Sequence, residues 1–281
     1  MALSFIEILK VVFLGIVEGV TEWLPISSTG HMLLVDEFIS LNASTDFKEM
    51  FFVVIQLGAI LAVVTIFWNK MWPFQLKDKT QPVMKKDTWS MWFKTVVACI
   101  PGAIVTILFD NYIEAHLHTA VVIAIALIFY GIAFIVIENY HKGKKAKVTA
   151  LDGIDYKLAF WIGMFQLIAA IFPGTSRSGA TIVGALLLGV SRTVAAEYTF
   201  FLAIPVMFGA SLLKGVKFLA GASMTSMEGA ILAVGMVVAF VVSFFVIKFL
   251  LGYVKKHDFK VFGYYRIALG IIVILFFLIR G

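Results

Sequence analysis

The sequence predicts an all-α polytopic membrane protein with six transmembrane helices, two re-entrant helical hairpins and inverted-topology repeats. Three observations lead to this fold class. First, 61% of the 281 residues are hydrophobic and only 14% are charged, whereas soluble domains have about 45–50% apolar and about 25% charged residues. Second, six apolar stretches are long enough to cross a bilayer. Third, two further apolar stretches are interrupted by motifs that resemble each other.

The composition also excludes several classes of protein. A soluble core of this length does not hide so much apolar surface behind so few charges, so a soluble enzyme and a disordered chain are excluded. The net charge is +6, but basic loops of a membrane protein set its orientation, and we expect a lipid bilayer and no nucleic acid as partner. The single cysteine, Cys99, predicts no disulfide. A homodimer is possible, but the sequence does not determine the oligomeric state, because lipid-facing and partner-facing apolar surfaces have the same composition.

The six predicted transmembrane helices follow from the length of the apolar runs. A spanning helix needs about 20 mainly apolar residues. Six stretches satisfy this requirement: 51–69, 88–109 (with a bend expected near Pro101), 119–138, 197–216, 225–250 and 263–280.

Two other apolar regions are divided by polar motifs. Residues 5–40 contain EGVTEWLPISSTGH, and residues 157–190 contain FPGTSRSGAT. Pro25 and Pro173 disfavour helix at the residues before them, and the Ser, Thr and Gly residues that follow are typical of turns and helix N-caps. Each half is too short to cross comfortably. A helix, a break and a second helix at one membrane depth indicate a re-entrant hairpin, which requires surrounding protein or a water-filled cavity.

The two breaks indicate an internal repeat. Their motifs align without gaps at an offset of 148 residues, which pairs Gly15 with Gly163, Pro25 with Pro173, and Ser28 with Ser176. Each half then has one hairpin and three spans, and because three is odd, the second half is inverted relative to the first. We therefore expect a single integral membrane domain, 1–281, with repeat one at 1–140 and repeat two at 155–281.

The loop charges give the orientation of this topology. The loops at 70–87, 139–157, 191–196 and 251–262 fall on one side and hold 14 of the 23 Lys and Arg residues. Basic loops mark the cytoplasmic side. Both termini and the mouth of the first hairpin are therefore expected on the periplasmic side, and the second hairpin is expected to enter from the cytoplasm.

A pair of acidic residues precedes the first break. Glu18 and Glu22 are four residues apart and share one helix face. Two carboxylates this close at membrane depth need a divalent cation or a guanidinium to stay ionised, and Arg177 in the second break is the available guanidinium. The alternative is that these charges only fix helix packing, which is disfavoured because a buried ion pair rarely outperforms apolar packing.

The two turns have the character of an anion site. A flexible, hydroxyl-rich turn that opens onto a helix N-terminus and carries an arginine suits a phosphate or two linked phosphates. The alternative, that the small residues serve close helix packing, explains the glycines but not the arginine. The residues predicted to bind the anion are Ser27, Thr29, Gly174, Thr175, Ser176, Arg177 and Ser178.

The attacking group is not fixed by the sequence. Ser28 is ranked first as nucleophile, with His31 or Glu22 as the base that accepts its proton. Attack by His31, or by a water molecule that His31 activates, remains an alternative. The predicted catalytic residues are Glu22, Ser28, His31 and Arg177.

The motifs EGVTEWLPISSTGH and PGTSRSGAT, with AAEYTFFLAIP and FGYYRIALG, resemble the undecaprenyl-diphosphate phosphatase family, also called the bacitracin-resistance family, over essentially the whole chain. The resemblance implies a bacterial inner (plasma) membrane enzyme that hydrolyses undecaprenyl diphosphate to undecaprenyl phosphate and inorganic phosphate. This reaction recycles the lipid carrier of peptidoglycan synthesis and is associated with bacitracin resistance. The resemblance also implies an active site facing the periplasm and a divalent cation, Mg²⁺ or Ca²⁺, which Glu18 and Glu22 would hold. The family's functional positions correspond to Glu18, Glu22, Ser28, His31, Ser176 and Arg177.

A second function is compatible with the same architecture. Inverted repeats with broken helices at the midplane also occur in secondary transporters and lipid flippases. On this reading the charged residues bind an anionic polyprenyl lipid or a coupling ion, and the protein moves the lipid across the membrane. Phosphate release by the purified protein distinguishes the two functions, because hydrolysis needs no compartments.

Overall fold

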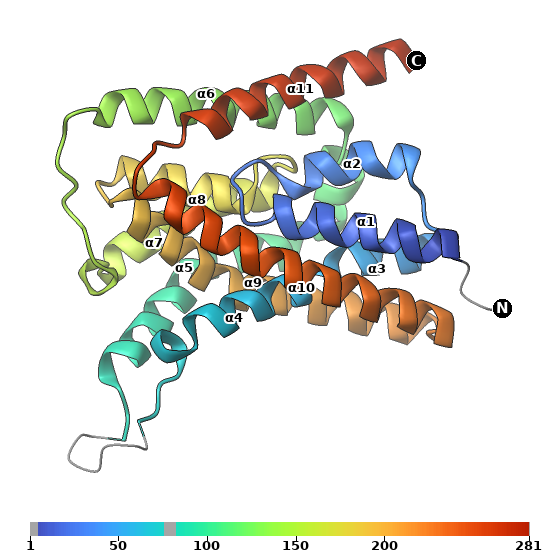
Figure 1. The fold of residues 1–281 in the computed structure, drawn as a ribbon, viewed down its shortest axis with the longest axis horizontal. Helices are drawn as coiled ribbons and strands as arrows, with labels where there is room; N and C mark the ends of the chain where they lie inside the picture. Colours follow the sequence, from blue (N-terminus) through green and yellow to red (C-terminus); the bar gives the residue numbers. More distant parts are fainter. Residues whose placement is uncertain (1–4, 76–82, 281) are drawn as a thin grey trace.

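The chain folds into a bundle of helices (Figure 1), given by a computed structural model that describes residues 5–75 and 83–280. Within these residues the regular secondary structure consists of helices alone. They are α1 (Phe5–Thr21), α2 (Ser28–Phe38), α3 (Thr45–Val54), α4 (Gln56–Met71), α5 (Lys86–Leu117), α6 (Ala120–His141), the 3₁₀ turn η1 (Leu151–Gly153), α7 (Tyr156–Ile171), α8 (Arg177–Leu187), α9 (Arg192–Gly221), α10 (Ser226–Val254) and α11 (Lys260–Arg280).

The predicted transmembrane helices are confirmed by length and composition. Six stretches of the described chain are long and apolar enough to cross a membrane: Thr45–Met71, Lys86–Phe109, Ala120–His141, Arg192–Gly221, Ser226–Val254 and Lys260–Ile279. The first begins earlier than expected, because the Ser44 side chain caps α3 by accepting the Phe47 N–H. The helix α5 continues through Pro101.

The predicted breaks also occur where the sequence places them. The helix α1 ends at Thr21 and α2 starts at Ser28, whereas α7 ends at Ile171 and α8 starts at Arg177. Both α2 and α8 have 11 residues. Since a helix rises about 1.5 Å per residue, each is about half as long as the hydrocarbon core is thick.

The helices on either side of each break have comparable neighbours. In the first half, α1 packs against α2 and along α10; in the second, α7 packs against α8 and along α5. The helices α6 and α11 lie side by side (Figure 1). Their backbones approach closely where Gly131 and Gly263 meet, because a Cβ on either glycine would lie 2.7 Å from the carbonyl oxygen of the other.

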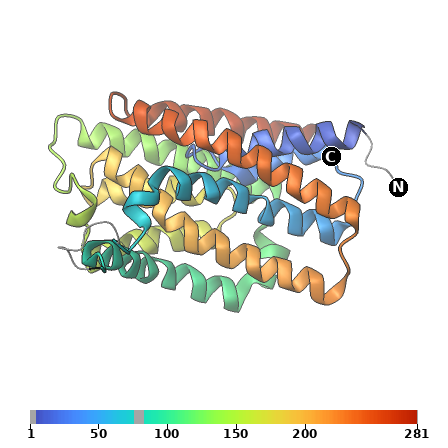
Figure 2. The same cartoon turned by 60° about the horizontal axis from the view of Figure 1, so that its bottom comes forward.

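The basic loops gather at one end of the bundle. The Glu138 carboxylate, at the end of α6, pairs with Arg192 and accepts the Phe259 N–H, which joins three of these loops. Lys70 pairs with Glu197 of α9 at the same end. The start of α1 and the end of α11 both lie at the opposite end of the bundle (Figures 1 and 2). Residues 76–82 of the first basic loop lie outside the described residues.

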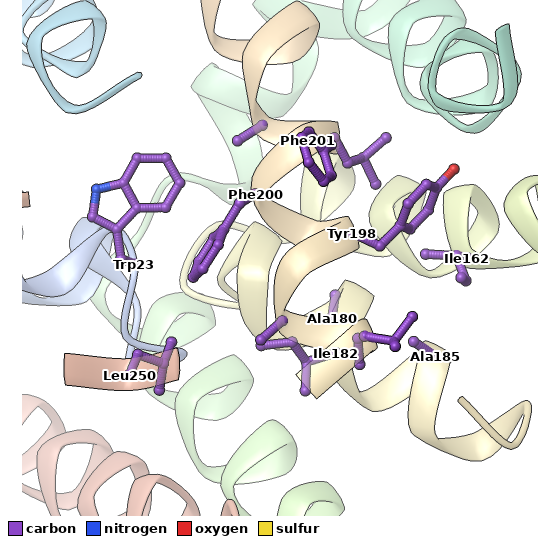
Figure 3. Packing of buried hydrophobic residues seen from close by; sticks show 14 of the residues in the cluster. Trp23, Ile162, Ala180, Ile182, Ala185, Tyr198, Phe200, Phe201 and Leu250 are labelled. Atoms are coloured by element: carbon purple, nitrogen blue, oxygen red, sulfur yellow. The ribbon is translucent and has the colours of Figure 1, made fainter. Parts of the chain in front are cut away.

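The core surrounds α8 and α9. Figure 3 shows Trp23, from the first break, beside Phe200 of α9, and the two rings meet edge to face with centroids 5.3 Å apart. Nearly all of α8 is buried, including its small residues. At Gly184 a Cβ would lie 2.4 Å from the Phe165 ring, so this glycine serves close helix packing. The core therefore holds both breaks in fixed positions around α9.

Candidate active site

The two breaks end in the same backbone conformation. Ser27 has a φ of 74° and Ser176 a φ of 67°, which is uncommon for residues other than glycine. Each serine caps the helix after the break, because Ser27 Oγ accepts the Gly30 N–H and Ser176 Oγ accepts the Gly179 N–H, both at 3.2 Å. Such strained caps persist only where the surrounding structure enforces them.

These caps correct the ungapped alignment of the two motifs. Ser27 is equivalent to Ser176, so the offset in the turns is one residue larger than expected, and Ser28 corresponds to Arg177. The second break has two residues, Gly174 and Thr175, between its proline and its cap, where the first has one. The two breaks thus place a serine and an arginine at the same position of their helices.

The centre of the site is a contact between the two breaks. Arg177 Nη2 donates to Glu22 Oε1 at 2.8 Å, and Ser28 Oγ donates to Glu22 Oε2 at 2.8 Å. Both side chains of the ion pair are largely buried. The structure therefore brings together three of the predicted catalytic residues, and both Glu22 oxygens are engaged.

Other groups of the second break and of α9 support this contact. Ser178 Oγ donates to the Glu22 carbonyl oxygen at 3.3 Å and lies 3.1 Å from Ser176 Oγ. Arg177 Nη1 donates to the Thr199 carbonyl oxygen at 3.2 Å, and Nη2 lies 3.4 Å from the Met207 sulfur. Thr199 and Met207 could not be predicted from the sequence, because only the folded chain brings α9 to the second break.

Glu18 differs from Glu22 in its surroundings. It is 1% exposed, and its Oε1 has no hydrogen-bond partner among the described residues. An orphaned buried carboxylate oxygen is costly and fits a bound cation. The described residues contain no group of three or more His, Cys, Asp and Glu that could hold a metal ion. Mg²⁺ is commonly held by one or two carboxylates with water and substrate phosphate oxygens, so the chemistry of Glu18 and Glu22 is compatible with such an ion.

His31 is oriented away from Ser28. Its Nδ1 lies 2.7 Å from the Ser27 carbonyl oxygen, and its Nε2 lies 2.7 Å from the Tyr265 hydroxyl, with the two rings stacked. A carbonyl oxygen only accepts, so Nδ1 carries the proton and the neutral ring offers Nε2 as acceptor to Tyr265. In the described structure no hydrogen bond joins His31 to Ser28. Of the two predicted bases, only Glu22 contacts the serine.

The Tyr265 hydroxyl can be removed without other change. On the alternative in which His31 attacks or activates a water molecule, Tyr265→Phe is expected to lower kcat/KM for the expected phosphate release about fivefold, because one hydrogen bond that orients His31 is lost and such a bond is worth about 1 kcal/mol. The measurement is steady-state kinetics in detergent. Tyr264→Phe is the matched control, since Tyr264 is the preceding residue of α11 and is exposed. An equal effect of both substitutions would argue against a role of Tyr265 in orienting His31.

The remaining predicted anion-binding residues have mainly structural contacts. Gly174 has a φ of +87°, and a Cβ there would lie 2.6 Å from the Ile123 carbonyl oxygen of α6, so glycine is required for close packing. Thr175 is buried, and its carbonyl oxygen accepts from Arg266. Thr29 is half-buried in the first turn of α2.

Arg266 is a further residue near the site that is not among the predicted ones, although it lies in the motif FGYYRIALG. A signal was available, because an arginine within a transmembrane apolar run is costly and indicates function. Its partners were not predictable, since they are backbone carbonyl oxygens of distant segments.

A carboxylate, a guanidinium and a serine hydroxyl lie together between two helix N-termini inside an apolar bundle. The fold defines an integral membrane protein, and the charges and helix N-termini of the site suit an anionic group. A family model described as bacitracin resistance protein BacA matches residues 11–272. The chain belongs to this family, and it is a multi-pass protein of the bacterial inner (plasma) membrane.

The chain is also similar to several curated relatives over nearly their whole length. It is 69% identical to an undecaprenyl-diphosphatase of Enterococcus faecalis, with 98% of this chain and 99% of the relative covered. It is 63% identical to an undecaprenyl-diphosphatase of Desulfitobacterium hafniense, with 99% of both chains covered. It is 61% identical to undecaprenyl-diphosphatase 1 of Clostridium acetobutylicum, with 99% of this chain and the whole relative covered.

Proposed function

We propose that this chain is an undecaprenyl-diphosphate phosphatase, which hydrolyses undecaprenyl diphosphate to undecaprenyl phosphate and inorganic phosphate. It thereby recycles the lipid carrier of peptidoglycan synthesis and confers bacitracin resistance. The observation that carries the proposal is the identity of 69% over almost the full length to a protein named for this activity. The contact of Glu22 with Arg177 and Ser28 suits the chemistry.

The proposed reaction begins with the Ser28 hydroxyl. Glu22 accepts the serine proton while Oγ attacks the terminal phosphorus, and the bond to the bridging oxygen breaks. Undecaprenyl phosphate leaves with the electron pair of that bond. Water then attacks the phosphorus of the phosphoserine, the bond from phosphorus to Oγ breaks, Oγ takes back its proton from Glu22, and inorganic phosphate is released. Arg177, at the positive end of α8, stabilises the charge on the phosphoryl oxygens, which is the main task of a phosphoryl-transfer enzyme.

The proposed cofactor is a divalent cation, Mg²⁺ or Ca²⁺. Glu18 is the protein ligand that fits best, because its buried Oε1 has no partner among the described residues. Glu22 is the second proposed ligand, through an oxygen that it shares with Arg177 or Ser28. When bound, the cation would neutralise charge on the diphosphate oxygens.

The proposed topology has two re-entrant hairpins related by an inverted repeat, with the site open to the periplasm. Three observations support it: the 11-residue lengths of α2 and α8, the identical caps Ser27 and Ser176, and the matching neighbours of α1 and α7. The basic loops lie at the end opposite the start of α1, which supports a cytoplasmic position for them.

The function is tested with purified protein in detergent. Phosphate release from undecaprenyl diphosphate is expected without any membrane compartment. A flippase or transporter, the alternative function, would bind the lipid but release no phosphate in detergent. Absence of turnover with bound lipid would therefore favour transport.

Ser28→Ala is expected to lower phosphate release by at least about 100-fold, because the proposed nucleophile is lost. With the unchanged protein and substrate labelled with ³²P at the terminal phosphate, acid quenching is expected to trap a labelled phosphoserine. Ser191→Ala is the matched control, since Ser191 precedes α9 without a side-chain capping bond. An active Ser28→Ala variant would leave His31 or water as the attacking group.

A further inference from the structure

Arg266 of α11 is a buried charge without a carboxylate partner. It is 0% exposed, and no ion pair involves it among the described residues. Arginine stays protonated in proteins, so this position carries a full positive charge. Burying such a charge is expensive unless hydrogen bonds satisfy it, and a charge retained at membrane depth marks function by default.

The hydrogen bonds of Arg266 reach both helix breaks. Nη1 donates to the carbonyl oxygen of Pro25 at 3.3 Å, in the first break. Nη2 donates to the carbonyl oxygens of Gly174 at 3.0 Å and Thr175 at 2.8 Å, in the second break. One guanidinium therefore joins two backbone segments that are about 150 residues apart in the chain.

The helix α6 holds the guanidinium from the other side. Nε donates to the Leu127 carbonyl oxygen and Nη2 to that of Ala126, each at 3.4 Å, and the guanidinium carbon lies 5.7 Å from the centre of the Tyr130 ring. Five carbonyl oxygens thus take the place of a carboxylate. The α6 backbone therefore holds the Arg266 guanidinium, and the guanidinium in turn holds the backbone of both breaks.

The guanidinium also lies against the turn that carries Arg177. A Cβ on Gly179 would lie 3.0 Å from Arg266 Nη1. Gly179 donates its N–H to the cap Ser176, the residue before Arg177. A shift of Arg266 would therefore be transmitted to the first turn of α8.

We infer that Arg266 is a positioning residue for hydrolysis, which joins the backbones of the two breaks and so sets the placement of Arg177 relative to Glu22 and Ser28. The inference rests on the proposed site. A lysine at this position would keep the charge but offer its three donors from a single atom, whereas the planar guanidinium reaches acceptors on three segments at once.

The kinetic test uses Arg266→Lys and Arg266→Gln with undecaprenyl diphosphate in detergent. Each variant is expected to lower kcat about 100-fold, because a displacement of about 1 Å in the reacting groups has an effect of this size. KM is expected to change less than about threefold, since Arg266 donates to backbone carbonyl oxygens and to none of the side chains proposed to bind the diphosphate. The matched control is Arg192→Lys, in which the Glu138 pair is altered and kcat is expected to stay within twofold. Wild-type kcat in folded Arg266→Lys would overturn the inference.

A second readout does not depend on activity. Amide hydrogen exchange in detergent is expected to be faster in both 22–31 and 172–180 in the Arg266 variants, and unchanged there in Arg192→Lys. Unchanged exchange in either segment would overturn the inference. If the wild-type protein released no phosphate, the proposed function would fail, and the exchange result would still decide whether Arg266 joins the breaks.

A third variant covers the case in which both Arg266 substitutions prevent folding. Gly179→Ala keeps the arginine and displaces Nη1 by a few tenths of an ångström. It is expected to lower kcat about tenfold and to raise exchange in 22–31, which belongs to the other break. Unchanged kcat and exchange in Gly179→Ala would contradict the inference.

Discussion

Arg177→Ala is expected to abolish phosphate release from undecaprenyl diphosphate, with a loss of about 1000-fold or more. An arginine that stabilises a transferring phosphoryl group contributes about 10³–10⁵ in kcat. In this protein the loss has a second cause, because the Glu22 carboxylate would remain buried without the Arg177 guanidinium that pairs with it. The measurement is initial-rate phosphate release by protein purified as a monodisperse peak in detergent.

Two further variants separate catalysis from folding in this experiment. Arg177→Lys keeps a positive charge near Glu22 but cannot also reach the Thr199 carbonyl oxygen in the same geometry, so it is expected to fold and to remain at least about 100-fold impaired. Arg192→Lys is the matched control, seven residues before Thr199 on α9, and is expected to remain active. Near-normal turnover of Arg177→Ala would refute its role at the phosphate.

Glu22→Gln is expected to reduce phosphate release about 10²–10⁴-fold, the usual contribution of a positioned general base. The amide keeps the size of the side chain but cannot take the Ser28 proton, and it leaves the Arg177 charge without a counter-ion. The dependence of the residual rate on added Mg²⁺ or Ca²⁺ is expected to be lost as well. Both effects are measured by titrating the metal against the rate.

Glu197→Gln is the matched control for this substitution. Glu197 pairs with Lys70 at the end of the bundle where the basic loops gather, and no hydrogen bond joins its side chain to either break among the described residues. Its replacement is expected to leave the rate and the metal dependence unchanged. Metal-stimulated turnover in Glu22→Gln would count against metal binding at this carboxylate.

Much of the fold follows from the sequence because a bilayer imposes simple rules. Apolar length predicts the spans, and Pro25 and Pro173 predict the breaks. The start of the first span was wrong because the polar residues Asp46, Lys48 and Glu49 hide the apolar period of α3. The repeat register was wrong by one residue in the turns, because the caps Ser27 and Ser176 are recognisable only from their backbone angles.

The candidate site was predictable only in part. The cost of burying charge singles out Glu22 and Arg177 from the sequence, and the structure brings them together. The choice of partner was not predictable: Arg177 contacts Glu22, and Glu18 Oε1 has no hydrogen-bond partner in the described part of the chain. Tyr265 and Arg266 reach the breaks only through the packing of α11, which no local pattern encodes.

The ion pair across the breaks has a consequence for how the protein is made. Glu22 and Arg177 are 155 residues apart, and domains emerge from the ribosome amino-terminal end first. Until Arg177 has been translated, the Glu22 carboxylate of the nascent chain lacks the guanidinium that pairs with it in the folded protein. A chain that terminates before Arg177 therefore contains the first motif intact but cannot form the proposed hydrolytic centre.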